Sequence, residues 1–175
     1  MKRILPVFIL TLCMAISAAG QHQYEVLVES PGEKTLKGVI SRDLVEKDTS
    51  FRWYAENLKG YTPNAKALDG LKKHKDSIRL LVFMGTWCED SHFVIPKLFS
   101  LLDAAGFPMN RVSLVGVDRA KTTVGHLEAA LDVKNVPTIM VMKNGKEMGR
   151  VVEFGKYGMF DMDLGEILSS GLNFP

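Results

Sequence analysis

The chain has 175 residues, a length that suits a single compact domain. Its formal net charge is +2, and residues 1–20 contribute two basic and no acidic side chains, which leaves 20 basic and 20 acidic residues in the remainder. A formally neutral remainder gives no electrostatic argument for binding nucleic acid, so we expect no nucleic-acid partner.

Residues 1–20 have the layout of a secretory signal peptide. Two basic residues come first, and the apolar run 4–16 that follows is too short to span a bilayer as a helix. Four small residues then offer a cleavage site. We therefore expect a periplasmic or secreted protein without stable membrane insertion. Cys13 leaves with the signal, so Cys88 is then the single cysteine of an exported chain, and no internal disulfide is possible.

The next two segments precede the predicted core. Residues 21–40 are polar with short apolar alternation, which is typical of an extended tail or an edge strand. Residues 41–76 form a predicted helical extension. Asp48 or Thr49 can cap its first helix, and Thr62–Pro63 is a favourable start for its second helix, with proline in the first turn.

The rest of the chain alternates between strands and helices. Continuous apolar runs predict strands that are buried on both faces, the dipeptide Asn144-Gly145 predicts a hairpin, and Gly106 marks a helix end. The predicted strands are 79–84, 112–117, 138–142 and 147–154, and the predicted helices are 88–105, a short one within 118–131, and one from Asp161 to about 170. Together these elements predict an α/β fold in which a mixed central sheet is flanked by helices on both faces.

The sequence GTWCEDSH places Cys88 where a buried strand ends and a helix begins. Unpaired N–H groups and the helix dipole at this position favour an anion, and a thiolate is an anion. Trp87 would shield the sulfur and offer a flat apolar contact. Ser91, one turn on, could donate a hydrogen bond to the sulfur, whereas the charges of Glu89 and Asp90 would disfavour a thiolate. Cys88 is thus a candidate reactive thiol whose ionisation is subject to opposing effects.

This turn resembles the active site of the thioredoxin superfamily. The resemblance rests on Trp87–Ser91 after an apolar strand and on Pro96, which matches the proline that kinks the family's active-site helix. It rests also on Val136–Thr138, which is similar to the family's cis-proline motif. The strand and hairpin of residues 138–146 match in register, and the similarity extends from Ile78 to the C-terminus.

The resemblance implies a thioredoxin-like fold over residues 41–175. It also implies that the proline loop lies against Cys88, with Val136 and Pro137 holding the backbone of a client, and that no cofactor is needed. More narrowly, the chain is similar to exported thioredoxin-like proteins of the Bacteroidetes type, which carry Gly-Thr-Trp-Cys-x-Asp-Ser/Thr and a preceding Trp-Tyr helix, here Trp53-Tyr54.

Departures from the family pattern gather around the missing second cysteine. Ser91 stands in place of the resolving cysteine, Val82 in place of a buried aspartate that handles its proton, and Leu114 in place of a lysine near that acid. By register, Glu153 replaces a glycine that lines the substrate groove, although a short insertion would place Gly155 there instead. A dithiol reductase needs a second thiolate to attack the mixed disulfide, so these residues exclude that cycle.

Four interpretations of the site remain open. The first is monothiol exchange, in which Cys88 forms mixed disulfides with exported client proteins or peptides that carry thiols or disulfides. The second is a non-catalytic module that binds a peptide or partner in the same groove. In the third, Cys88 is only a small buried hydrophobe. In the fourth, Cys88 and His92 share a metal ion, but we expect no metal and interpret His92 as a solvent-facing side chain near the thiol.

Overall fold

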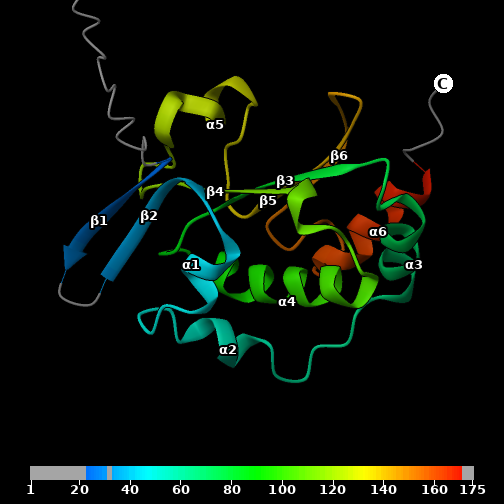
Figure 1. Cartoon of the computed structure of the whole chain (residues 1–175), viewed down its shortest axis with the longest axis horizontal. Coiled ribbons are helices and arrows are strands. Elements are labelled where there is room, and N and C mark those ends of the chain that lie inside the picture. Colours follow the sequence, from blue (N-terminus) through cyan, green and yellow to red (C-terminus); the bar gives the residue numbers. More distant parts are fainter. Residues whose placement is uncertain (1–22, 31–32, 171–175) are drawn as a thin grey trace, which may run out of the picture.

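The computed structural model describes residues 23–30 and 33–170 (Figure 1). The expected signal peptide, residues 1–20, lies outside these ranges. In chain order the elements are β1 (Tyr24–Ser30), β2 (Glu33–Ile40), α1 (Arg42–Glu46), α2 (Trp53–Asn57), α3 (Ala65–His74), β3 (Arg79–Met84), α4 (Glu89–Ala105), η1 (Met109–Arg111), β4 (Val112–Gly116), η2 (Val124–His126), α5 (Leu127–Ala130), β5 (Thr138–Lys143), β6 (Lys146–Val152) and α6 (Phe160–Ser170). None of the helices within the described ranges has the length and apolar character needed to cross a membrane.

The strands form one six-stranded sheet in the order β1-β2-β4-β3-β5-β6. Only β3 and β4 pair in parallel, and the other neighbours are antiparallel, so the sheet is mixed as predicted. The continuous apolar run Arg79–Met84 is β3, which lies between β4 and β5 near the centre of the sheet. The residues 21–40 contribute the hairpin of β1 and β2, and β1 is an edge strand of the sheet.

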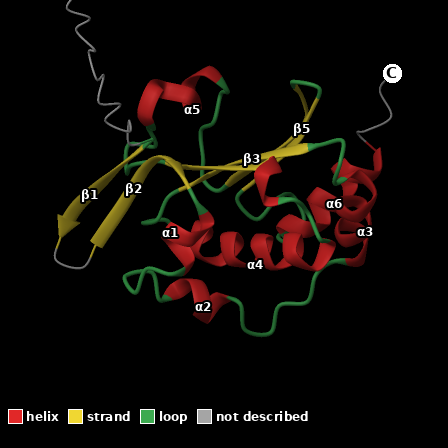
Figure 2. Cartoon of the chain, in the orientation of Figure 1, coloured by secondary structure: helices red, strands yellow, loops and turns green. Residues whose placement is uncertain are grey.

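Helices cover the two faces of the sheet unequally (Figures 1 and 2). The helices α1, α2 and α4 lie below the sheet in this view, with α3 and α6 beside them, while α5 lies above it. The buried side chains form two clusters that match this division. One cluster joins the sheet to α1–α4 and α6, and the other, smaller cluster includes Val133, Val136 and Met140 with the half-buried Leu127 of α5.

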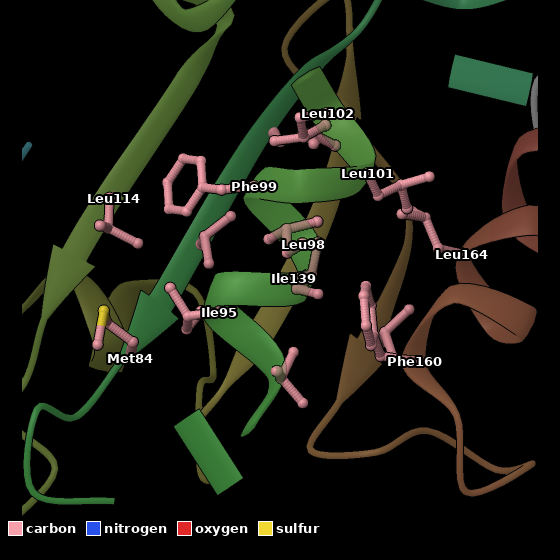
Figure 3. Packing of buried hydrophobic residues seen from close by; sticks show 14 of the residues in the cluster. Met84, Ile95, Leu98, Phe99, Leu101, Leu102, Leu114, Ile139, Phe160 and Leu164 are labelled. Carbon is pink, nitrogen blue, oxygen red and sulfur yellow. The ribbon is translucent and has the colours of Figure 1, made fainter. Parts of the chain in front are cut away.

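The helix α4 fills the centre of the large cluster (Figure 3). Its side chains Leu98, Phe99 and Leu102 are at most 2% exposed, and in the close view Phe99 points toward Leu114 of β4. The helix ends at Gly106, whose φ of 60° is left-handed and whose N–H reaches the carbonyls of the last turn, as predicted. Pro96 lies inside α4. This rigid packing fixes the helix whose first turn follows Cys88.

Three predicted helix starts differ from the observed ones. The helix α2 begins at Trp53 rather than after Asp48 or Thr49, since the Asp48 carboxylate accepts the N–H of Ser50 and pairs with a lysine. The cap of α3 is Asn64, whose side chain accepts the N–H of Ala67.

The third wrong start concerns α6. Asp161 lies inside this helix and is 2% exposed. Its carboxylate accepts the Tyr61 hydroxyl at 2.8 Å and the Asn64 N–H at 3.0 Å, so it joins α6 to the segment before α3 instead of capping its own helix. The predicted hairpin is confirmed: Asn144 and Gly145 both have positive φ, and β5 pairs with β6 on either side.

Candidate functional site

The tight turn Gly85–Cys88 joins β3 to α4 and presents the cysteine. The N–H of Cys88 donates to the Gly85 carbonyl at 3.0 Å, and the Cys88 carbonyl accepts the first helical bond, from the N–H of His92 at 2.9 Å. Cys88 is therefore the N-cap of α4, with extended φ and ψ of −95° and 121°. Its side chain is half-buried, and it is the one cysteine among the residues that the structure describes. The position at a helix N-terminus is the one expected from the sequence.

The thiol of Cys88 faces a loop that is 48 residues away in the sequence. Its Sγ donates to the carbonyl of Val136 at 3.2 Å. The Val136–Pro137 peptide bond is cis, in agreement with the resemblance, and Val136 is 3% exposed. A client sulfur that reached Cys88 would thus meet the backbone of this loop as well.

The acidic residues Glu89 and Asp90 occupy the first turn of α4. Glu89 is exposed and Asp90 is half-buried. Negative charge there is favourable for the helix dipole. The two carboxylates thus stabilise the start of the helix that follows Cys88.

The Ser91 side chain does not have the partner that we predicted. It is fully buried, and its Oγ accepts the N–H of Gly85 at 3.2 Å, so it supports the turn from beneath. No hydrogen bond from Ser91 to the sulfur of Cys88 is present among the described contacts. The hydroxyl acts on the backbone of the turn because the first turn of α4 carries residue 91 inward, under the strand end.

The ring of Trp87 is fixed on one flank of the thiol. Its Nε1 donates to the Val117 carbonyl at 3.0 Å, and the guanidinium of Arg119 lies 5.7 Å from the ring centroid. A Cβ on Gly85 would lie 2.7 Å from this ring, so the turn needs glycine at that position. Trp87 is half-buried and offers the flat apolar contact that the sequence predicts.

His92 is not the solvent-facing side chain that we predicted. Its ring stacks on Trp53 of α2, with centroids 4.2 Å apart and planes 15° apart, and its Nε2 lies 2.7 Å from the Thr86 carbonyl. Burial lowers the pKa of His92, although the Thr86 carbonyl and Glu89 act in the opposite direction. In the sequence, Trp53 is part of the resemblance only, and the i, i+4 spacing of Cys88 and His92 does not predict that His92 stacks on Trp53.

The backbone of Glu153 meets the cis-proline loop. Thr138 pairs with Val152, and the next N–H, that of Glu153, donates to the Pro137 carbonyl at 2.7 Å. Glu153 has a left-handed φ of 55°, a conformation that favours glycine. Gly155 instead packs against the carboxylate of Asp163. A half-buried acidic residue therefore adjoins the cis-proline loop.

The two replaced proton-handling positions lie directly beside each other. Val82 of β3 pairs with Leu114 of β4 in the parallel register. They are 0% and 3% exposed and belong to the large hydrophobic cluster. These two side chains thus cannot accept or supply a proton at residue 91. Within the described ranges there is also no group of three or more His, Cys, Asp or Glu side chains that could hold a metal ion.

Comparisons with known proteins agree with this geometry. The sequence profile of the family described as thioredoxin matches residues 64–159, more than half of the chain. No curated protein sequence matches the chain.

Several solved structures are similar at low identity. An HIV epitope scaffold has a TM-score of 0.45 and 17% identity over 67% of this chain and 79% of its own. A Pseudomonas aeruginosa protein of unknown function has a TM-score of 0.44 and 17% identity, over 67% of this chain and 78% of its own. The thioredoxin of Fasciola hepatica has a TM-score of 0.40 and 21% identity, over 58% of this chain and 86% of its own.

Proposed function

Because the chain belongs to the thioredoxin family, we propose that it performs thiol–disulfide exchange through one thiol, that of Cys88. The observation that carries this proposal is the contact between Sγ of Cys88 and the Val136 carbonyl beside the cis-proline. It supports a thiol that meets a bound polypeptide, because the backbone of an extended client can lie along this loop while its sulfur reaches Cys88.

The proposed reaction has two exchange steps. Cys88 loses its proton to solvent, and the thiolate attacks one sulfur of a client disulfide. A bond forms between the two sulfurs, the client S–S bond breaks, and the other client sulfur leaves as a thiolate that takes up a proton. A second thiol then attacks the mixed disulfide and releases Cys88. If that thiol belongs to the client, the disulfide is rearranged. If it is an external thiol, it stays bonded to the client sulfur as a new mixed disulfide, and a second external thiol then reduces the client fully and leaves as the disulfide of the two external thiols.

The surroundings of Ser91 support a one-thiol cycle over a damaged two-thiol cycle. The hydroxyl cannot attack a disulfide, and it is buried with the Gly85 N–H as its partner. The neighbouring Val82 and Leu114 would leave a cysteine at residue 91 without a proton acceptor. The absence of the second thiol is thus matched by the absence of the groups that it would need.

A direct experiment compares the chain with Cys88→Ala in the presence of a peptide disulfide. We expect a mixed disulfide on non-reducing gels with the wild type and none with Cys88→Ala, and an alkylation rate of Cys88 that varies with pH.

Ser91→Cys should form an internal disulfide but reduce insulin slowly, since Val82 provides no acid. Absence of any mixed disulfide at Cys88 would refute the exchange function, and fast insulin reduction by Ser91→Cys would refute the argument from Val82.

A second candidate function is a non-catalytic module that binds a peptide in the same groove. The half-buried Glu153 beside Pro137 favours it, because a carboxylate there repels an incoming thiolate or acidic client. Retention of client peptides by Cys88→Ala at wild-type affinity, together with an unreactive thiol in the wild type, would support this module instead.

We also propose that the protein is exported and that its clients are exported proteins or peptides. The support is the sequence of residues 1–20, with its basic start, short apolar run and small residues. Mass spectrometry of protein recovered outside the cytoplasm tests this proposal. A chain that begins near residue 21 is expected, and an intact chain confined to the cytoplasm would contradict it.

A further inference from the structure

A small pocket lies beside the turn that presents Cys88. Its volume is about 180 Å³, and its aromatic lining comes from Phe51, Trp53, Trp87 and His92. Thr86 and Trp87, the two residues before Cys88, are part of its wall. The pocket is therefore next to the residue that would react with a client's sulfur.

The walls of the pocket are held in place by several contacts. His92 is fixed between the ring of Trp53 and the Thr86 carbonyl. The Thr86 hydroxyl accepts the N–H of Leu36 at 3.1 Å and donates to the Lys34 carbonyl at 3.0 Å, which attaches β2 to the turn. A pocket whose side chains are already ordered loses little entropy when it binds a ligand.

The charges around the pocket are balanced. Lys34 pairs with the carboxylate of Asp48, and Arg119 pairs with Glu33 at 2.8 Å. Burial lowers the pKa of His92, which favours the uncharged ring at neutral pH. The pocket thus presents aromatic faces without excess charge, which favours an uncharged ring over an anionic or cationic side chain.

The volume fits one six-membered ring. An apolar protein cavity of about 150 Å³ takes up benzene, and the pocket here is slightly larger, at about 180 Å³. It is also smaller than the cavities of roughly 300 Å³ or more that hold whole drug-sized ligands. A single aromatic side chain is therefore the ligand that the size allows.

Six of the ten residues that line the pocket lie outside the family match. Phe51 and Trp53 precede residue 64, where that match begins. The pocket is thus a feature of this chain beside its thiol, and the ligand that we assign to it rests on the proposed exchange function. We propose that the pocket binds the side chain of a Phe or Tyr residue that neighbours the reacting cysteine of a client, and so selects among clients.

The exchange rate with matched peptides tests this assignment. Two peptides carry a cysteine activated as its thionitrobenzoate disulfide, with Phe or Ala next to it. Attack by Cys88 forms the Cys88–peptide disulfide and releases thionitrobenzoate. We expect the Phe peptide to react about 10-fold faster, as one buried ring contact allows. Equal rates for the two peptides would overturn the assignment and leave the exchange function intact.

Ser50→Trp offers a variant that fills the pocket from its exposed rim and removes no core side chain. It should lower the Phe:Ala rate ratio to about 1. The matched control is Ser77→Trp, an exposed site before β3, at the opposite end of that strand from the turn. The control should keep the ratio near 10-fold, and a ratio that stays high in Ser50→Trp would overturn the assignment.

A binding measurement tests the pocket without the chemistry. The chain has two tryptophans, Trp53 and Trp87, and both line the pocket, so the intrinsic tryptophan fluorescence comes from this pocket alone. N-acetyl-phenylalanine amide should change this fluorescence in Cys88→Ala, with saturation, and should not do so in Cys88→Ala with Ser50→Trp. No response in Cys88→Ala would overturn the assignment, whereas a response without any peptide exchange in the wild type would keep the pocket and refute the exchange function.

Discussion

The two faces of the sheet carry hydrophobic cores of very different size, and the candidate site lies between them. The core around α4 contains 26 buried hydrophobic residues, and the core under α5 contains six. Cys88 precedes the helix that fills the large core, but its side chain packs against the small core, to which Val136 belongs. Local stability follows the amount of buried apolar surface. The comparison therefore indicates a helix that is held rigidly by the large core, and a contact between the thiol and the cis-proline loop that lies on the weaker core.

The largest expected effect comes from equal truncations in the two cores. Met84 and Met140 are each 0% exposed, and they belong to the large and the small core respectively. We expect Met84→Ala to lower the free energy of unfolding by about 3–4 kcal/mol and Met140→Ala by about 2 kcal/mol, because the thinner layer under α5 can relax into the cavity. Urea titration measures both values, and equal losses would show that the two cores are equally rigid.

A smaller effect is expected where the N-terminal extension is fastened to the large core. Asp161→Ala removes two hydrogen bonds to a buried carboxylate, from Tyr61 and from the N–H of Asn64. We expect a loss of about 2–3 kcal/mol, against about 1 kcal/mol for Tyr61→Phe, which removes one of them. Thermal unfolding of both variants at the same pH measures these two losses of stability. If Asp161→Ala costs no more than Tyr61→Phe, the hydrogen bond from the Asn64 N–H adds nothing to this attachment.

The smallest expected effect concerns a carboxylate above the small core. Glu128 of α5 is 6% exposed and accepts the Thr123 N–H at 2.9 Å. Burial by itself would raise the pKa of Glu128, but the hydrogen bonds from the backbone N–H groups of Thr123 and Glu128 and the interaction with His126 together outweigh it and hold this pKa below its ordinary value of 4.5. The unfolded chain therefore takes up the proton first, so the stabilisation is complete above pH 4.5 and is lost as the pH falls through the lowered value.

The variant Glu128→Gln tests the expected loss of this stabilisation at low pH. At neutral pH the variant should be less stable by about 1 kcal/mol, because a neutral acceptor binds an N–H more weakly than a charged one. The difference from the wild type should shrink as the medium becomes acidic, measured by urea unfolding across that range. A difference that is independent of pH would show that the carboxylate contributes by shape rather than by charge. Faster amide exchange in residues 118–136 than in α4 would further support the comparison of the two cores.

The sequence predicted the elements whose signals are local. The apolar run of β3, the left-handed end of α4 at Gly106 and the Asn144-Gly145 hairpin are all confirmed, since each depends on residues within one segment. The resemblance predicts that Cys88 lies against the cis-proline loop, and Sγ of Cys88 contacts the Val136 carbonyl of that loop. These predictions needed no knowledge of distant packing.

The remaining features depend on partners that are remote in the sequence. The Ser91 hydroxyl accepts the N–H of Gly85 rather than donating to the sulfur, because the first turn of α4 carries residue 91 inward. His92 meets Trp53, which is 39 residues earlier and on another helix. The start of α6 was misplaced because Asp161 is used by the segment before α3. No periodicity or capping rule encodes such pairings, since they arise only when the layers pack.

The single thiol of the described chain has a consequence for the rate law of the proposed reaction. A mixed disulfide at Cys88 has no neighbouring cysteine in the described residues to release it. Unless a second thiol of the client attacks this mixed disulfide, release is second order, first order in the mixed disulfide and first order in an outside thiol. For clients without such a thiol, each molecule is consumed by one client where outside thiols are scarce and turns over many clients where they are abundant. The concentration of small thiols then decides whether this protein is a stoichiometric trap or a catalyst.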